Sequence, residues 1–123
     1  MGKKRDSKAT SVKTIYDLQA EICAALAHPV RLHILDLVAP AEKTSTELLE
    51  VLQVPKANLS QHLAVLKDAG IIETRREGQF QFHRLAFSRI KDACALVRSL
   101  LVERISLQEK KNSELMRELR AQR

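Results

Sequence analysis

Residues 44–85, TSTELLEVLQVPKANLSQHLAVLKDAGIIETRREGQFQFHRL, decide the fold of this chain. Thr44 stands three residues before Glu47, which is the capping-box pattern of a helix start. Three leucines follow at spacings that one helix face can share, Leu48, Leu49 and Leu52. The first part of the stretch therefore predicts a short helix.

The middle of the stretch predicts a second helix. Pro55 suits the first turn of a helix, and Gly70 is typical of a helix end. Between them Leu59, Leu63 and Leu66 recur at three- and four-residue intervals, which forms one apolar stripe. Because so tight a turn separates the two helices, the sequence predicts a helix-turn-helix.

The last part of the stretch alternates with a period of two. Residues 71–85 contain two short extended runs separated by Glu77 and Gly78, and Phe80 and Phe82 share one side of the second run. Alternation on both sides of a glycine turn predicts a β-hairpin.

Helices are expected on both sides of this stretch. Apolar residues at helical spacing predict a first helix from Thr14, and Pro29 restarts the chain into a second helix that stops at Pro40. After the hairpin, Ser88 is a suitable cap for a long helix whose apolar positions continue to Ile105. The predicted fold class is mainly α with a small β-hairpin wing, a winged helix-turn-helix of order α-α-α-α-β-β-α.

Three segments are expected along the chain: a basic flexible tail over residues 1–13, the winged helix-turn-helix domain over 14–107, and a charged helical extension over 108–123. The formal charge of +6 comes from the two ends, since residues 1–13 carry five basic residues against one acidic residue, and residues 108–123 carry five against three. The middle of the chain is neutral, so charge alone is weak evidence for a nucleic-acid partner.

Composition and motifs exclude several classes of protein. No apolar run reaches the roughly 20 residues that span a bilayer, and the amino terminus lacks the apolar stretch of a signal peptide, so we expect a cytoplasmic protein. No nucleophile with a partner base, phosphate-binding glycine loop or carboxylate pair can be recognised, so we do not expect an enzyme or a bound cofactor.

The segment ALAHPVRLHILDLV, residues 25–38, together with LSQHLAVLKDAGII and the glycine-centred wing, resembles the ArsR/SmtB family of bacterial repressors. The resemblance covers roughly residues 14–102. It implies a homodimer that binds double-stranded operator DNA, with the fourth helix as the recognition helix and the first and fifth helices as the dimer interface. It usually also implies an inducer that releases the DNA.

The candidate DNA contacts lie on the first turns of the recognition helix and on the wing. A helical wheel places the leucine stripe inward and leaves polar side chains outward or on the shoulders, and amide, hydroxyl and amine groups suit base edges and phosphates. The candidates are Lys56, Asn58, Ser60, Gln61, Arg75, Arg76 and Gln79. Glu73 and Glu77 oppose the wing arginines, and His62 is expected at the rim of the leucine stripe, where it packs against the domain or reaches a phosphate.

The metal sites that the resemblance implies are not matched by this sequence. The cysteine positions of one site hold Thr44, Thr46 and Leu49, and a hydroxyl does not replace a thiolate. The positions of a second site, between the fifth helices, hold Phe87, Arg89, Leu100 and Glu103. The histidines offer no ligand pair, because His28 and His33 face different ways and His83 stands alone on a strand. We therefore expect no metal.

The sequence contains two cysteines, and it does not decide whether they sense the signal that releases the DNA. The cysteine pair of the family's oxidant and reactive-sulfur sensors is replaced here by Asp36 and Val102, whereas Cys23 and Cys94 lie in the two predicted dimer helices. The favoured interpretation is that both are buried core thiols. The alternative is a thiol switch that responds to oxidants, reactive sulfur or arsenite. A different class, a protein interaction module that docks through the helix after Leu107, also stays open.

Overall fold

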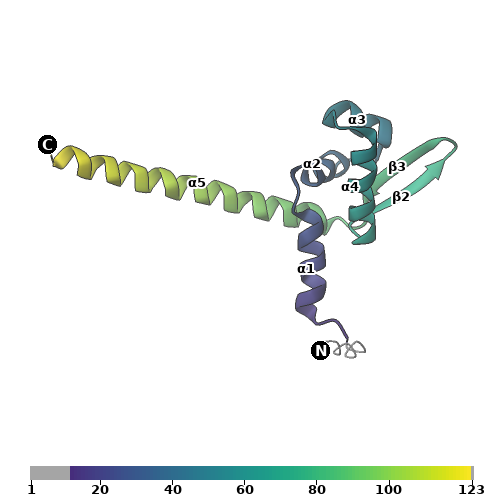
Figure 1. The fold of residues 1–123 in the computed structure, drawn as a ribbon, viewed down its shortest axis with the longest axis horizontal. Coiled ribbons are helices and arrows are strands. Elements are labelled where there is room, and N and C mark those ends of the chain that lie inside the picture. Colours follow the sequence, from purple (N-terminus) through teal and green to yellow (C-terminus); the bar gives the residue numbers. More distant parts are fainter. Residues whose placement is uncertain (1–11, 123) are drawn as a thin grey trace, which may run out of the picture. The chain divides into compact units, whose positions relative to one another are not determined.

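The computed structural model describes residues 12–122, so the predicted basic tail lies outside the described residues except for its last two positions. The chain divides after Phe87 into two compact units. The first unit holds helices α1 to α4 and a small sheet, and the second unit is the single helix α5 (Figure 1). The predicted fold class is confirmed.

The first unit opens with two helices, α1 (Ile15–Leu26) and α2 (Pro29–Val38). Thr14 caps α1 through a capping box with Asp17, which the sequence analysis missed. The carboxylate accepts hydrogen bonds from Thr14, and this lowers the pKa of Asp17. His28 caps α2, because its Nδ1 accepts a hydrogen bond from the N–H of Val30 at 3.1 Å. Each helix therefore has a side chain that satisfies one of its free N–H groups.

The predicted helix-turn-helix is formed by α3 (Ser45–Leu52) and α4 (Lys56–Asp68). Thr44 caps α3 through the predicted capping box with Glu47. The turn begins at Gln53, whose φ of 54° lies in the left-handed region that ends many helices. Three leucines of α4 are buried as predicted, Leu59, Leu63 and Leu66.

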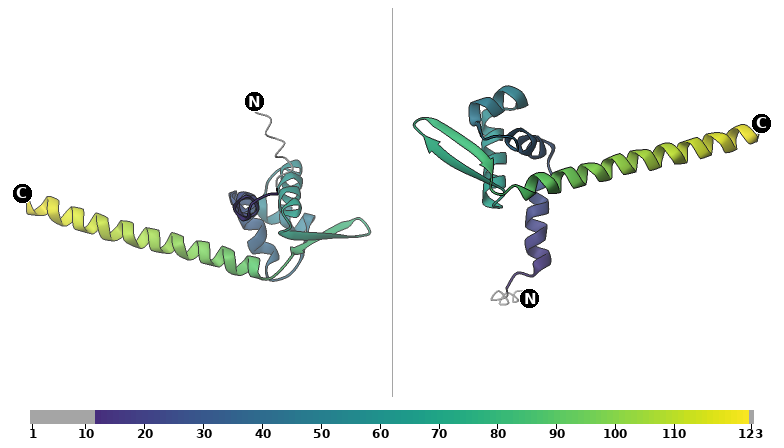
Figure 2. Two further views of the ribbon diagram at one scale, coloured as in Figure 1. Left: turned by 90° about the horizontal axis from the view of Figure 1, so that it is seen from below. Right: turned by 180° about the vertical axis from the view of Figure 1, so that it is seen from behind.

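The sheet has three antiparallel strands in the order β1-β3-β2. β2 (Ile72–Glu77) and β3 (Phe80–Leu85) form the predicted hairpin, which we call the wing and which projects beyond the helices (Figure 2). Glu77 pairs with Phe80, so the two-residue loop is Gly78 and Gln79, one residue later than predicted. Gly78 has a φ of 61°, which glycine adopts without strain.

The third strand, β1 (Lys43–Thr44), was not predicted. It pairs Lys43 with His83 and Thr44 with Phe82, directly before α3 begins. A strand of two residues is too short to show a period in the sequence, and its pairing partner lies about forty positions away. β1 ties the start of the helix-turn-helix to the wing.

The core of the first unit comes from all of its helices and from the start of β2. Its members are almost all aliphatic: Ala25, Ile34, Leu35, Val38, Leu48, Leu59, Leu63, Leu66, Ile71 and Ile72. His83 is the exception, a polar side chain that is only 2% exposed. The scarcity of aromatic residues is thus matched by a core of branched aliphatic side chains.

The second unit is α5 (Arg89–Ala121), a continuous helix of 33 residues. It covers the predicted fifth helix and also the charged extension after Leu107, which stays helical. Ser88 occupies the N-cap position, but its side chain makes no capping hydrogen bond. Between residues 12 and 122 no helix combines the length and the apolar character needed to cross a membrane.

Candidate nucleic-acid interface

The first turns of α4 present the predicted contact residues to solvent. Lys56, Asn58, Ser60 and Gln61 are all exposed, whereas Leu59 is 2% exposed. This division follows from the helical period, because the same leucine stripe that fixes α4 to the core leaves the opposite face free. α4 therefore offers amine, amide and hydroxyl groups on one accessible surface.

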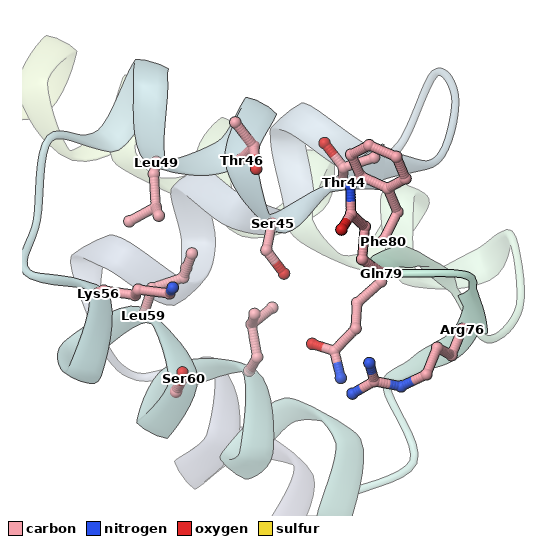
Figure 3. A pocket seen from close by; sticks show the side chains of 12 residues that line it. Thr44, Ser45, Thr46, Leu49, Lys56, Leu59, Ser60, Arg76, Gln79 and Phe80 are labelled. Carbon is pink, nitrogen blue, oxygen red and sulfur yellow. The ribbon is translucent and has the colours of Figure 1, made fainter.

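An open groove of about 330 Å³ lies between α3, α4 and the wing (Figure 3). We call it the α3–α4–wing groove. Four of the predicted contact residues line it, Lys56, Ser60, Arg76 and Gln79, and the start of α3 adds three hydroxyl residues, Thr44, Ser45 and Thr46. Figure 3 shows the side chains of Gln79 and Arg76 reaching into the groove from the wing. The groove thus gathers hydrogen-bond donors and two cations from three elements.

The hydroxyl residues at the start of α3 were not among the predicted contacts. In the sequence, Thr44 and Thr46 stand where the family's metal site has cysteines. In the structure they stand at the N-terminus of α3. The capping box uses the N–H groups of Thr44 and Glu47, and the helix dipole with the other first-turn N–H groups favours an anion. The capping-box pattern at Thr44 was the signal that could have identified this edge of the groove.

Asn58 and Gln61 do not line this groove, although both are exposed on α4. Arg75 faces the other side of the wing, as expected for the strand neighbour of Arg76. There Arg75 forms ion pairs with Glu42 and Glu77. Its guanidinium also lies 4.5 Å from the ring centroid of Phe82. Arg75 is therefore held against its own sheet, away from the groove.

The predicted neutralisation of the wing arginines by Glu73 and Glu77 is correct for only one pair. Glu77 pairs with Arg75 at 2.7 Å, but Glu73 pairs with Arg84 at 2.8 Å. Among the described residues none forms an ion pair with Arg76. Arg76 is consequently the wing arginine whose charge is available in the groove.

His62 lies at the rim of the leucine stripe, as predicted, and is half-buried. Its Nδ1 lies 3.2 Å from Nη1 of Arg31, and its ring centroid lies 4.3 Å from that of His28. Burial, with the nearby His28 and Arg31, lowers the pKa of His62. The contact between His28 and His62 was not predicted, because helical spacing within α2 cannot show that His28 meets α4.

His83 does not stand alone. Its Nε2 lies 2.8 Å from the hydroxyl of Ser45 and its Nδ1 lies 2.9 Å from the hydroxyl of Thr74. Burial and the charge of Lys67 lower the pKa of His83, so the neutral ring is favoured. The ring joins β3 to both β2 and the first turn of α3.

Neither Cys23 nor Cys94 forms a disulfide within the described residues. Cys23 is exposed on α1 and Cys94 is half-buried on α5, so the expectation that both are buried in the core of the chain was wrong. The apolar stripe of α1 is open to solvent in this chain, and the residue beside Ile22 is therefore open too. Within residues 12–122 no three histidine, cysteine or acidic side chains gather closely enough to hold a metal ion.

The comparisons with known proteins agree with this geometry. A family profile described as a helix-turn-helix domain matches residues 26–75. The uncharacterised HTH-type transcriptional regulator Rv0081 of Mycobacterium tuberculosis is 36% identical over 93 residues, which cover 75% of this chain and 82% of the relative. The HTH-type transcriptional repressor SmtB of the same species is 38% identical over 74 residues, which cover 60% of this chain and 55% of the repressor.

Solved structures show the same arrangement. The crystal structure of Rv0081 matches with a TM-score of 0.72 and 34% identity, and the match covers 79% of this chain and 98% of that one. A second match is the solution structure of a homodimeric winged helix-turn-helix DNA-binding domain from Mycobacterium bovis, which is described as a possible ArsR-family regulator. Its TM-score is 0.66 and its sequence identity is 31%, and the match covers 76% of this chain and 91% of that one.

Proposed function

This chain belongs to the ArsR/SmtB family of winged helix-turn-helix transcriptional regulators, and we propose that it is a repressor that binds a pseudo-palindromic operator as a homodimer. The observation that carries the proposal is the joint placement of polar side chains on the free face of α4 and in the α3–α4–wing groove. A helix with this face fits the major groove of DNA, and a projecting hairpin beside it fits the neighbouring backbone.

The candidate DNA-contact residues fall into two sets, one suited to base edges and one suited to the phosphate backbone of DNA. Asn58 and Gln61 carry amides that can bond adenine bidentately, and they stand on the exposed face of α4 outside the groove. Lys56, Arg76 and the α3 N-terminus supply positive charge and N–H donors that suit phosphate. We assign base reading to the first set and backbone binding to the second.

The homodimer is supported by apolar side chains that this single chain leaves exposed. On α1 these are Ile15, Leu18 and Ile22, and on α5 they include Leu96, Val97, Leu100, Leu101 and Ile105. Exposed apolar stripes of this kind mark contact surfaces. The Mycobacterium bovis domain, at 31% identity, is itself described as homodimeric. Two copies related by a two-fold axis would present two α4 helices to a symmetric site.

We propose further that this regulator does not use the family's usual metal sites. Thr46 and Leu49 line the α3–α4–wing groove, and neither side chain is a metal ligand of the soft type. A second candidate for the regulation of DNA binding is a thiol switch, in which a cysteine reacts and the DNA is released. The exposure of Cys23 favours this candidate. Replacing both Cys23 and Cys94 with serine separates regulation without a metal from the thiol switch. If oxidant or arsenite still releases the DNA from this variant, the thiol switch is excluded.

Salt dependence tests DNA binding against the alternative of a protein interaction module. Binding of the full chain to a random-sequence duplex pool should weaken steeply between 50 and 200 mM salt, by roughly 10³-fold for about six phosphate contacts, because bound counterions are released. Failure to retain any duplex at low salt would contradict the proposal and favour the interaction module.

A further inference from the structure

Arg31 joins the recognition helix to the end of α1. Its Nε donates to the carbonyl of Ala25 at 2.6 Å, and its Nη2 donates to the carbonyl of Ala24 at 3.2 Å. Its Nη1 lies 3.2 Å from Nδ1 of His62 on α4. The last turn of α1 has no basic residue of its own, so Arg31 supplies the cation that a helix C-terminus favours.

The donors around the two histidines fix their protonation. Arginine can only donate hydrogen bonds, so Nδ1 of His62 must accept and the ring proton sits on Nε2. The backbone N–H of Val30 likewise donates to Nδ1 of His28. The centroids of the two rings lie 4.3 Å apart, and the ring planes are tilted by 46° to each other. This arrangement requires the neutral form of His62, since a proton on Nδ1 would remove the acceptor.

We propose that Arg31 is a positioning residue that couples the recognition helix to α1 through neutral His62, and that protonation of His62 breaks this coupling and weakens DNA binding. The proposal rests on the proposed function, because α4 is taken as the DNA-reading helix. A protonated His62 would place three cationic or titratable side chains together, with His28 on one side and Arg31 on the other. Mutual repulsion would then loosen α4 from α1.

The direction of the pH effect follows from the groups that face His62. Arg31 lies in α2 and His28 is the cap of α2. The elements α1 and β2 also pack on α4, but they place no charged side chain beside His62. Burial and these two neighbours lower the pKa of His62 below the ordinary 6.5. The stabilisation is therefore present above pH 6.5 and is lost as the pH falls from there through the lowered pKa.

The test measures DNA affinity against pH for the full chain and two variants. The probe is a labelled duplex selected by the wild-type protein from a random pool at pH 7.5. His62→Gln keeps an acceptor oxygen for Arg31 but does not titrate. His33→Gln is the matched control, since His33 is an exposed histidine of α2. Far-UV circular dichroism at each pH confirms that all three proteins are folded.

The wild-type protein and His33→Gln should lose affinity between pH 7.5 and pH 5.5. The loss should be less than about tenfold, because His62 titrates below 6.5 and protonation of one such group at pH 5.5 can weaken binding by no more than that factor. His62→Gln should lose little. An equal loss in His62→Gln and wild type, or no loss in wild type, would overturn the proposal.

A second readout needs no DNA and keeps the two proposals distinguishable. Nitrogen NMR of the imidazoles should show His62 as the Nε2–H form at pH 7.5, titrating below 6.5. Arg31→Gln should raise that pKa, because it removes the neighbouring positive charge. An unchanged His62 titration in Arg31→Gln would contradict the coupling. If no duplex is bound at any pH, the proposed function fails while this titration still decides the coupling.

Discussion

His83 is buried in the sheet, yet both of its ring nitrogens have a hydroxyl partner. A buried polar group is tolerated when its hydrogen bonds are satisfied, and a neutral imidazole with one donor and one acceptor can use both hydroxyls. Ser45 begins α3 and Thr74 lies in β2, so one side chain fixes the wing to the helix-turn-helix. At this scale the fold depends on pairs of polar residues that are distant in the sequence.

Replacing Thr74 with valine should destabilise the first unit by about 1–3 kcal/mol, because the Nδ1 of His83 loses its partner while the shape of the side chain is kept. Urea denaturation measures the free energy of unfolding. Thr74→Ser, which keeps the hydroxyl, is the control and should cost less. Equal stability of the two variants would show that the hydrogen bond to His83 does not hold the wing.

At the scale of elements, the two faces of the wing have different surroundings. Arg75 is held by Glu42, Glu77 and the ring of Phe82 on one face, whereas Arg76 lies in the groove on the other. Both arginines were predicted as DNA contacts. Strand alternation places them on opposite faces of the wing, but the sequence does not show which of the two faces lies toward the groove. One ion-pair partner of Arg75, Glu42, directly precedes β1 and is brought near by the pairing of β1 with β3.

We expect Arg76→Ala to weaken DNA binding more than Arg75→Ala. Loss of one phosphate contact should reduce the slope of log affinity against log salt by about 1, with a similar effect on all sequences. Affinity measured over a salt series for both variants gives the comparison. A larger change in slope for Arg75→Ala would contradict our assignment of the groove as the backbone-binding surface.

The elements themselves were largely predictable from the sequence. α3, α4 and the wing were found because each has a period and a terminal signal, such as the capping box at Thr44 and the glycine at position 78. β1 was missed because two residues have no period. The partners of His62 and His83 were missed because Arg31 and Ser45 lie 31 and 38 positions away, and local patterns carry no information about such pairs.

At the scale of the whole molecule, the apolar stripes of α1 and α5 remain exposed in a single chain. Leu18 and Ile22 are nearly half exposed on α1, and Leu101 is similarly exposed on α5. A chain of 123 residues would gain stability by covering such surfaces with a second copy. The same stripe was predicted from spacing alone, but spacing does not show whether the chain itself covers it.

A charge placed in this stripe should therefore separate the copies. We expect sedimentation of the wild-type protein to give a dimer, and Ile22→Glu to shift it toward the monomer, because a carboxylate would be buried without a partner. Ala20→Glu is the control, since it adds the same charge at an exposed residue of α1 on the side opposite the apolar stripe. A wild-type monomer at micromolar concentration, or an unchanged dimer in Ile22→Glu, would contradict this interface.

Selection of duplexes from a random pool, by the wild-type protein and by Gln61→Ala, tests whether paired α4 helices recognise DNA. We expect the wild-type protein to enrich a pseudo-palindrome whose half-sites lie about 10 bp apart or a multiple of that distance, as two recognition helices require. Gln61→Ala should relax the preference at one position in each half-site, at symmetric places, because one base contact per α4 is lost. An enriched sequence without two-fold symmetry, or one that Gln61→Ala leaves unchanged at every position, would contradict recognition by paired α4 helices.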